Sequence, residues 1–170
     1  LHRFMESVID FELPVFACGE THDTPRLAAR DGGNTLATML TLFYYFVPNG
    51  VPFINSGQEV FEKQPINTGL DVREEDLYVL GEDDPFYMKL ALFDKYAFHY
   101  LNESRWELIQ KMEEAATIRK EYHHLFTTKE CASPLTFKKD EAPGIGFLLS
   151  GEDFKLISIA NTNPYEKEPL

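Results

Sequence analysis

The chain has 170 residues, of which 44% are hydrophobic and 26% are charged, and this composition is typical of a globular protein rather than a disordered one. Its formal net charge is −12, which argues against nucleic acid as a partner because phosphate binding needs clustered Lys and Arg. The sequence has no run of about 18 apolar residues and does not start with a charged stretch followed by an apolar one. It therefore predicts no membrane segment and shows no signal peptide.

The first part of the chain alternates between helical and strand-like segments. Residues 1–12 have the apolar spacing expected at the end of a helix. Residues 14–18 and residues 51–55 are short apolar runs, which are typical of parallel strands covered on both faces. Between them, Asn34 is placed to cap a helix that ends at residues 48–50.

The second part begins with a long segment that lacks a regular period. Residues 61–84 predict a long loop, and residues 85–100, which are rich in aromatics, predict a helix. Apolar positions from Leu108 to Tyr122 then mark one face of a long amphipathic helix. Three short strands separated by turns follow, at residues 134–138, 145–149 and 154–160.

This change of period predicts two domains. Residues 1–128 alternate strands and helices, whereas residues 129–170 contain only predicted strands, which pair in antiparallel fashion. A boundary near residue 128 is the simplest account of the change. No internal repeat or low-complexity segment is visible in the sequence.

The most informative loop follows the first predicted strand and spans residues 20–32. In α/β proteins, chemistry gathers at the carboxyl ends of such strands, which nominates His22 and Asp23. A carboxylate beside an imidazole suits glycoside cleavage, because fixed negative charge stabilises the oxocarbenium-like transition state. The alternative is a plain turn in which the Asp bonds its own backbone, and on spacing alone this alternative is favoured.

Two motifs favour the interpretation of His22 and Asp23 as a sugar site over that of a plain turn. Residues 22–26 read His-Asp-x-Pro-Arg, with Arg30 and Gly32 beyond, and closely resemble the strand-7 motif of the α-amylase superfamily. Residues 50–59 contain Gly-x-Pro, an apolar stretch and Gly-x-Glu, and resemble the strand-8 motif of the same superfamily. The motifs occur in the family's order, and a long helix and an all-β segment follow them, as in the family.

Three further segments are most similar to the bacterial maltosyltransferase branch of this superfamily. They are residues 62–65, 67–71 and 89–94. Together with the two strand motifs, they extend the resemblance over most of the chain.

The resemblance implies an α/β fold, namely the C-terminal portion of a TIM barrel with strands 7 and 8 and their helices, followed by the start of a small antiparallel β-sandwich. A whole barrel needs eight strands and about 250 residues, so the chain would be a fragment of a longer enzyme. We expect the remainder of the barrel, or self-association, to cover the open strand edges.

The resemblance also implies roles for individual residues. Asp23 matches the carboxylate that stabilises the transition state, and His22 matches the imidazole that hydrogen-bonds the sugar. Arg26 matches a motif arginine that orients the loop or contacts substrate, and Thr21 stands where most members have Asn, which leaves that substrate contact open. Three residues after the second strand either line the glucan cleft or are solvated surface: Glu59, Lys63 and Gln64.

The implied function is that of a retaining glycoside hydrolase or transglycosylase acting on α-1,4-glucan or maltooligosaccharides, similar to a maltosyltransferase or a 4-α-glucanotransferase. The family's nucleophile and acid/base follow strands 4 and 5, upstream of anything in this sequence, so we expect the isolated chain to be inactive. The alternative is a non-catalytic maltooligosaccharide-binding or interaction module.

The cysteines and histidines predict no metal and no cofactor. Cys18 and Cys131 lie far apart and belong to no CxxC or Cys/His spacing. Two buried thiols are favoured over a disulfide between them. The remaining clusters of histidine are more consistent with packing or helix-end contacts than with metal ligation.

Overall fold

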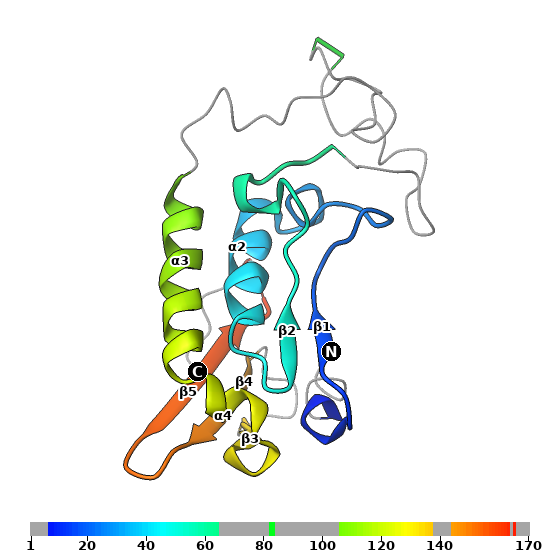
Figure 1. Cartoon of the computed structure of the whole chain (residues 1–170). Coiled ribbons are helices and arrows are strands. Elements are labelled where there is room, and N and C mark those ends of the chain that lie inside the picture. The colour runs from blue at the N-terminus through cyan, green and yellow to red at the C-terminus, as the bar shows by residue number, and fades with distance from the viewer. Residues whose placement is uncertain (1–6, 65–81, 84–105, 138–143, 164, 166–170) are drawn as a thin grey trace. The chain divides into compact units, whose positions relative to one another are not determined.

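The computed structural model describes residues 7–64, 82–83, 106–137, 144–163 and 165 (Figure 1). In this part of the chain the elements are η1 (Val8–Asp10), β1 (Val15–Ala17), η2 (Leu27–Ala29), α2 (Gly33–Tyr44), β2 (Gly50–Pro52), η3 (Gln58–Val60), α3 (Trp106–Glu121), α4 (His123–Thr127), η6 (Lys129–Cys131), β3 (Ala132–Pro134), β4 (Gly144–Ser150) and β5 (Lys155–Asn161).

The chain divides into two compact units. The first unit contains Leu1–Ala17, Met39–Phe53 and Lys111–Leu170, and the second unit contains Cys18–Thr38 and Ile54–Gln110. This division differs from the two domains expected from the sequence, residues 1–128 and 129–170, and that boundary stays a prediction.

Within the first unit, β1 and β2 pair in parallel (Figure 1), with Val15 opposite Gly50. The sequence therefore predicted the two strands and their parallel pairing correctly. In the given chain one face of this pair is open, because Phe16 is 69% exposed and its partner Val51 is 45% exposed; coverage of both faces stays a prediction for a longer protein. Successive side chains of a strand point to opposite faces, so the buried Ala17 faces inward while its neighbour Phe16 faces solvent.

Asn49 ties the start of β2 to the segment before β1. It has a positive φ of 52°, a conformation that Asn tolerates better than most residues. Its Nδ2 donates to the carbonyl oxygens of Val8, Phe11 and Leu13, at 3.1, 3.1 and 3.4 Å. Asn49 directly precedes the first residue of β2. Its side chain therefore connects the start of β2 to carbonyl groups that precede β1.

Helix α2 begins at Gly33, two residues before the first helical position that a cap at Asn34 would give. Gly32 and Gly33 both have positive φ, at 94° and 51°, which glycine adopts without the steric cost that a Cβ would bring. The backbone N–H of Gly33 donates to the carbonyl of Arg30 at 2.8 Å. Asn34 is therefore the second residue of the helix, and its predicted role as the cap was wrong.

An antiparallel sheet forms from the C-terminal strands in the order β3-β4-β5. The register of β4 with β5 runs from Gly144 opposite Asn161 to Ser150 opposite Lys155. This confirms the antiparallel pairing expected beyond residue 129. The first strand, β3, lies two residues earlier than expected, although the N–H of Leu135 still donates to the carbonyl of Gly146 at 2.9 Å.

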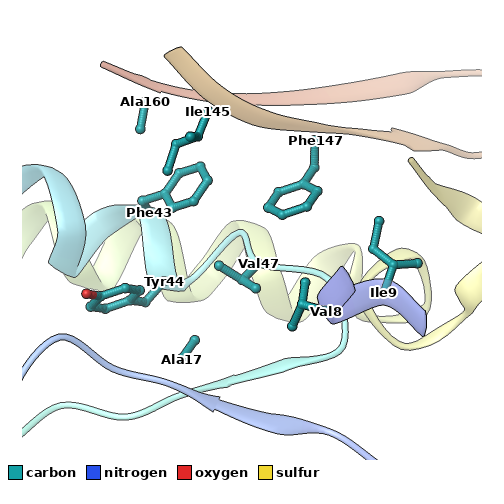
Figure 2. Packing of buried hydrophobic residues seen from close by; sticks show 9 residues of the cluster. All are labelled: Val8, Ile9, Ala17, Phe43, Tyr44, Val47, Ile145, Phe147 and Ala160. Carbon is teal, nitrogen blue, oxygen red and sulfur yellow. The ribbon is translucent and has the colours of Figure 1, made fainter. Parts of the chain in front are cut away.

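One apolar core joins these parts of the first unit. Figure 2 shows Phe43 from α2 facing Phe147 from β4, with ring centroids 6.0 Å apart and planes at 19°. Burying such side chains is the main favourable term in folding. The members of this cluster are Val8, Ile9, Ala17, Phe43, Tyr44, Val47, Ile145, Phe147 and Ala160.

Near the end of α3, Arg119 holds the segment between α2 and β2. Its Nη1 donates to the carbonyls of Tyr45 and Val47 at 2.7 and 3.3 Å, and its Nη2 donates to that of Gly50. The guanidinium also lies 4.6 Å from the centroid of the Phe126 ring. Burial lowers the pKa of Arg119, and the three carbonyls compensate part of the lost hydration.

The described residues are thus mixed α/β, as the sequence predicted. Several other expectations lie outside them, namely the helix at residues 85–100, the motif segments 67–71 and 89–94, and most of the loop at 61–84. Of the helix expected at residues 1–12, the described part contains the short η1.

Candidate functional site

The predicted pair His22 and Asp23 lies on a turn braced by two threonines. The N–H of Thr21 donates to Thr24 Oγ1 at 2.8 Å, and the N–H of Asp23 donates to Thr21 Oγ1 at 3.2 Å. The N–H of Thr24 also donates to the carbonyl of Thr21 at 3.3 Å. Threonine hydroxyls that bond nearby backbone groups favour turns over helix, so the local sequence itself shapes this turn.

The two side chains are in contact and open to solvent. His22 Nε2 lies 3.2 Å from Asp23 Oδ2, and the side chains are 64% and 40% exposed. The carboxylate is therefore oriented by its neighbour and still accessible to a ligand. Such a pair can accept hydrogen bonds from vicinal hydroxyl groups and donate hydrogen bonds to them.

Arg26, three residues beyond Asp23, is buried in the second unit. Its Nη1 donates to Glu20 Oε1 and to the carbonyl of Ser56, both at 2.8 Å, and its Nε donates to the carbonyl of Gln64 at 3.0 Å. Its Nη2 is also buried. These contacts are those of a residue that orients the loop; a substrate contact of Arg26 stays a prediction.

Glu20 is the buried counter-charge of Arg26, and the sequence analysis did not single it out. Its Oε1 also accepts from Asn55 Nδ2 at 3.1 Å, and its Oε2 accepts from the backbone N–H of Leu27 at 2.5 Å. Burying a carboxylate costs free energy unless it is paired and hydrogen-bonded. Its only signal in the sequence is its place near the end of a strand and six residues before an arginine.

The segment after β2, residues 55–64, folds into a tight loop around η3. Gly57 has a positive φ of 94°, and a Cβ at this position would lie 2.9 Å from the Cβ of Glu62. The buried Glu62 carboxylate accepts from the N–H groups of Lys63 and Gln64, each at 2.9 Å. Glycine at 57 is therefore required by both the backbone angle and the space.

The remaining predicted site residues lie in this loop. Glu59 is half-buried, and its Oε2 accepts from the N–H of Gly57 at 2.8 Å. Lys63 is exposed, whereas Gln64 is fully buried. A substrate contact by Lys63 needs no rearrangement of this loop, but a contact by the side chain of Gln64 does. The substrate roles of all three stay predictions.

The structure therefore brings the predicted residues together in one unit. The turn that carries His22 and Asp23 and the loop at 55–64 are joined through Glu20 and Arg26, whose side chains bond Asn55, Ser56 and Gln64. Neither strand motif by itself predicts this connection.

Other candidate features lie elsewhere. A hollow of about 300 Å³ in the first unit is lined in part by Asp10, Asn49, Phe126 and Lys129, and none of the predicted site residues lines it. Among the described residues, no three His, Cys, Asp or Glu side chains are close enough to hold a metal ion. In the same part of the chain, no helix has the length and apolar character needed to cross a membrane.

Both cysteines have free thiols in the structure. The expectation that they are buried was wrong, because Cys18 and Cys131 are both partly exposed. Cys18 lies directly after β1, where the chain leaves the strand pair. Partial burial raises the pKa of the Cys18 thiol, which keeps it protonated at neutral pH.

Comparison with known proteins gives matches among solved structures. No protein family model and no curated protein sequence matches the chain. Among solved structures, a cyclomaltodextrinase aligns with a TM-score of 0.49 and 20% sequence identity. The chain is similar to part of that structure. The alignment covers 82% of this chain and 20% of the other, so this chain spans about a fifth of the length of the solved one.

Proposed function

We propose that this chain is part of an α-amylase-like enzyme that acts on α-glucans, and that His22 and Asp23 form part of its sugar-binding site. The observation that carries the proposal is the exposed contact between His22 Nε2 and Asp23 Oδ2 on a braced turn that follows a parallel strand. The residues of this turn are those that resemble the family's strand-7 motif.

The chemistry follows from the two side chains. The carboxylate of Asp23 is held close to His22, so it can accept hydrogen bonds from sugar hydroxyls and stabilise positive charge that develops on the ring. The imidazole of His22 donates to a neighbouring hydroxyl and fixes the direction of the carboxylate. This makes Asp23 a transition-state stabiliser and His22 a substrate-binding residue.

The proposal extends to the fold of the parent enzyme. In it, β1 and β2 are strands 7 and 8 of a TIM barrel, and residues 129–170 begin a C-terminal β-sandwich. Their parallel pairing and the intervening helix α2 support this assignment. The exposed Phe16 and Val51, with Phe53 edge-on to Phe16 at 5.8 Å, form an apolar face that the remainder of a barrel or a second copy would cover.

The chain by itself then binds sugar without turning it over. A retaining mechanism needs a nucleophile and an acid/base, and no carboxylate of this sequence lies in a motif that resembles the family's motifs for these two roles. The parent is a retaining glycoside hydrolase or transglycosylase, similar to a maltosyltransferase or a 4-α-glucanotransferase; for a transferase, the exposed Lys63 lies on the acceptor side. The acceptor role is supported by the place of Lys63 on the loop that Arg26 joins to the His22–Asp23 turn.

A second function, a non-catalytic maltooligosaccharide-binding module, has one observation in its favour. The contacts that shape the turn, from Thr21, Thr24, Glu20 and Arg26, all come from this chain. A sugar site could therefore form here without the rest of a barrel.

The deciding experiment is isothermal titration of the purified chain with maltotetraose, run beside Asp23→Ala and an assay of glucan cleavage. We expect binding without turnover, and loss of binding in Asp23→Ala. The matched control is Asp10→Ala, because Asp10 is an exposed carboxylate of the first unit and should leave binding unchanged. Equal binding by wild type and Asp23→Ala contradicts the proposal, and turnover by the isolated chain contradicts the claim that it lacks the nucleophile and the acid/base.

A further inference from the structure

We infer that Glu20 is a positioning residue: its buried carboxylate holds the His22–Asp23 turn and the loop at 55–64 in one fixed arrangement. The inference rests on the proposed function for its effect on sugar binding, while its effect on the geometry of the turn is independent of that function.

The carboxylate of Glu20 collects donors from three places in the sequence. Arg26 Nη1 lies 2.8 Å from Oε1 and closes the base of the turn, and the N–H of Leu27 bonds Oε2 at the start of η2. Asn55 Nδ2 lies 3.1 Å from Oε1 and comes from the segment after β2. One side chain thereby fixes both ends of the turn and joins it to the second loop.

Charge and shape together make Glu20 hard to replace. Both of its oxygens accept from N–H donors, so an amide at this position must turn its NH₂ group toward a donor. The site is almost fully buried, so water does not compensate for the lost bond. Hydrogen bonds to charged groups are also stronger than those between neutral groups. Glu20→Gln therefore keeps the volume of the side chain and breaks the contact.

The effect at the sugar site follows from the position of the turn. Hydrogen bonds of Thr21 and Thr24 stabilise the turn itself. The residues on either side of the turn are held together by the bonds that Glu20 accepts from Arg26 and Leu27. If these bonds are lost, Asp23 is no longer fixed relative to the loop at 55–64. A binding site that must first be ordered binds more weakly than one already in place.

The test compares Glu20→Gln with wild type in two measurements. Maltotetraose affinity is measured by titration, and hydrogen exchange of the Asp23 and Thr24 amides is followed by NMR. We expect at least about tenfold weaker binding and at least about tenfold faster exchange at both amides, with exchange in β4 and β5 unchanged. Global destabilisation would instead accelerate exchange in the sheet as well.

Two further variants make the test decisive. Asp10→Asn is the matched control, because it removes a carboxylate charge from an exposed ion pair with Lys129, at 2.7 Å, and should change neither measurement. Asn55→Ala removes one of the three donors to Glu20, so it should shift both measurements in the same direction by a smaller factor. It also serves as the test if Glu20→Gln does not fold.

The outcomes separate the two proposals. If Glu20→Gln binds and exchanges like wild type while Asp23→Ala abolishes binding, the positioning role is wrong and the proposed function stands. If wild type itself does not bind, the proposed function fails, and faster exchange at Asp23 and Thr24 in Glu20→Gln still supports the positioning role. Unchanged exchange overturns it.

Discussion

The two units of this chain differ in how many polar side chains their cores contain. In the first unit the buried side chains are mostly aliphatic and aromatic, and the cluster around Phe43 and Phe147 joins the strand pair to the antiparallel sheet. In the second unit the described core mixes buried polar side chains with apolar ones such as Leu27, Val60 and Leu108. Of the eight buried polar side chains among the described residues, six lie in the second unit: Glu20, Arg26, Asn55, Gln58, Glu62 and Gln64.

The difference shows what each type of core contributes. Apolar burial is non-directional and roughly proportional to area, so it stabilises the first unit without requiring particular angles. A buried ion pair adds little net stability but tolerates few alternative arrangements, because each one leaves a charge unpaired. The unit that carries His22 and Asp23 is thus the one whose core specifies geometry.

The largest loss on the apolar side is expected for Phe147→Ala. Phe147 is fully buried against Phe43, so truncation removes transfer free energy and leaves a cavity, with a cost of about 3–5 kcal/mol. The measurement is the free energy of unfolding from urea titration. Ile157→Ala is the control, because Ile157 lies on the exposed face of β5 and its truncation should cost far less.

In the core of the second unit, Arg26→Met should lower the free energy of unfolding by a comparable amount. Its effect should not be additive with that of Glu20→Gln. It leaves the Glu20 carboxylate buried without its counter-charge, at a cost of about 3–5 kcal/mol. Adding Glu20→Gln removes that charge, so the double variant should lose less than the sum of the two single losses. Additive losses in urea unfolding would mean that the pair is not coupled. Lys129→Ala, which breaks the exposed pair with Asp10, should cost at most about 1 kcal/mol.

A smaller effect is expected for Arg119→Lys, which keeps the positive charge and replaces the two-branched guanidinium with a single ammonium group. Arg119 bonds the carbonyls of Tyr45, Val47 and Gly50, and one ammonium group cannot reach all three. A loss of about 1.5–3 kcal/mol is expected in thermal or urea unfolding. A Lys variant as stable as wild type would show that the positive charge, rather than the several hydrogen bonds of the guanidinium, provides the stability.

The smallest effect concerns Cys18 at alkaline pH. Burial raises its pKa above the ordinary value of 9.0, so the folded state holds this proton more tightly than the unfolded state does. The stability contributed by this group is full below pH 9 and is lost as pH rises through the folded-state pKa. The slope of stability against pH above 9 should therefore be shallower in Cys18→Ser than in wild type. An identical slope would contradict the assignment.

Local periodicity made much of the fold predictable. Alternating apolar residues at Ile145, Phe147 and Leu149 identified β4, and the short apolar runs identified β1 and β2. Strand exposure was not predictable in the same way. An apolar run does not say whether one face or both are covered, so the run alone did not identify Phe16 as the exposed residue.

The candidate site was predictable only in part. The motif placed His22 and Asp23 after a strand, where the structure also has them, but their partners were hidden. Glu20 and Asn55 are 35 residues apart, and Arg26 and Gln64 are 38 apart. Polar pairs at such separations leave no periodic signal, because their burial depends on tertiary contacts. The same reason explains why the burial of Gln64 was not visible in the sequence; its substrate role stays a prediction.

The parallel pairing of β1 with β2 also has a consequence for folding order. Val15 and Gly50 are 35 residues apart in the chain, whereas β4 and β5 are joined by a short turn at residues 151–154. Contacts between distant residues carry a larger loop-closure cost and slow folding. The turn with His22 and Asp23 lies inside the loop that the β1–β2 pairing closes. We therefore expect pulse-labelling hydrogen exchange to detect protection in β4 and β5 before it appears in this turn, so that the part of the chain proposed to bind sugar matures last.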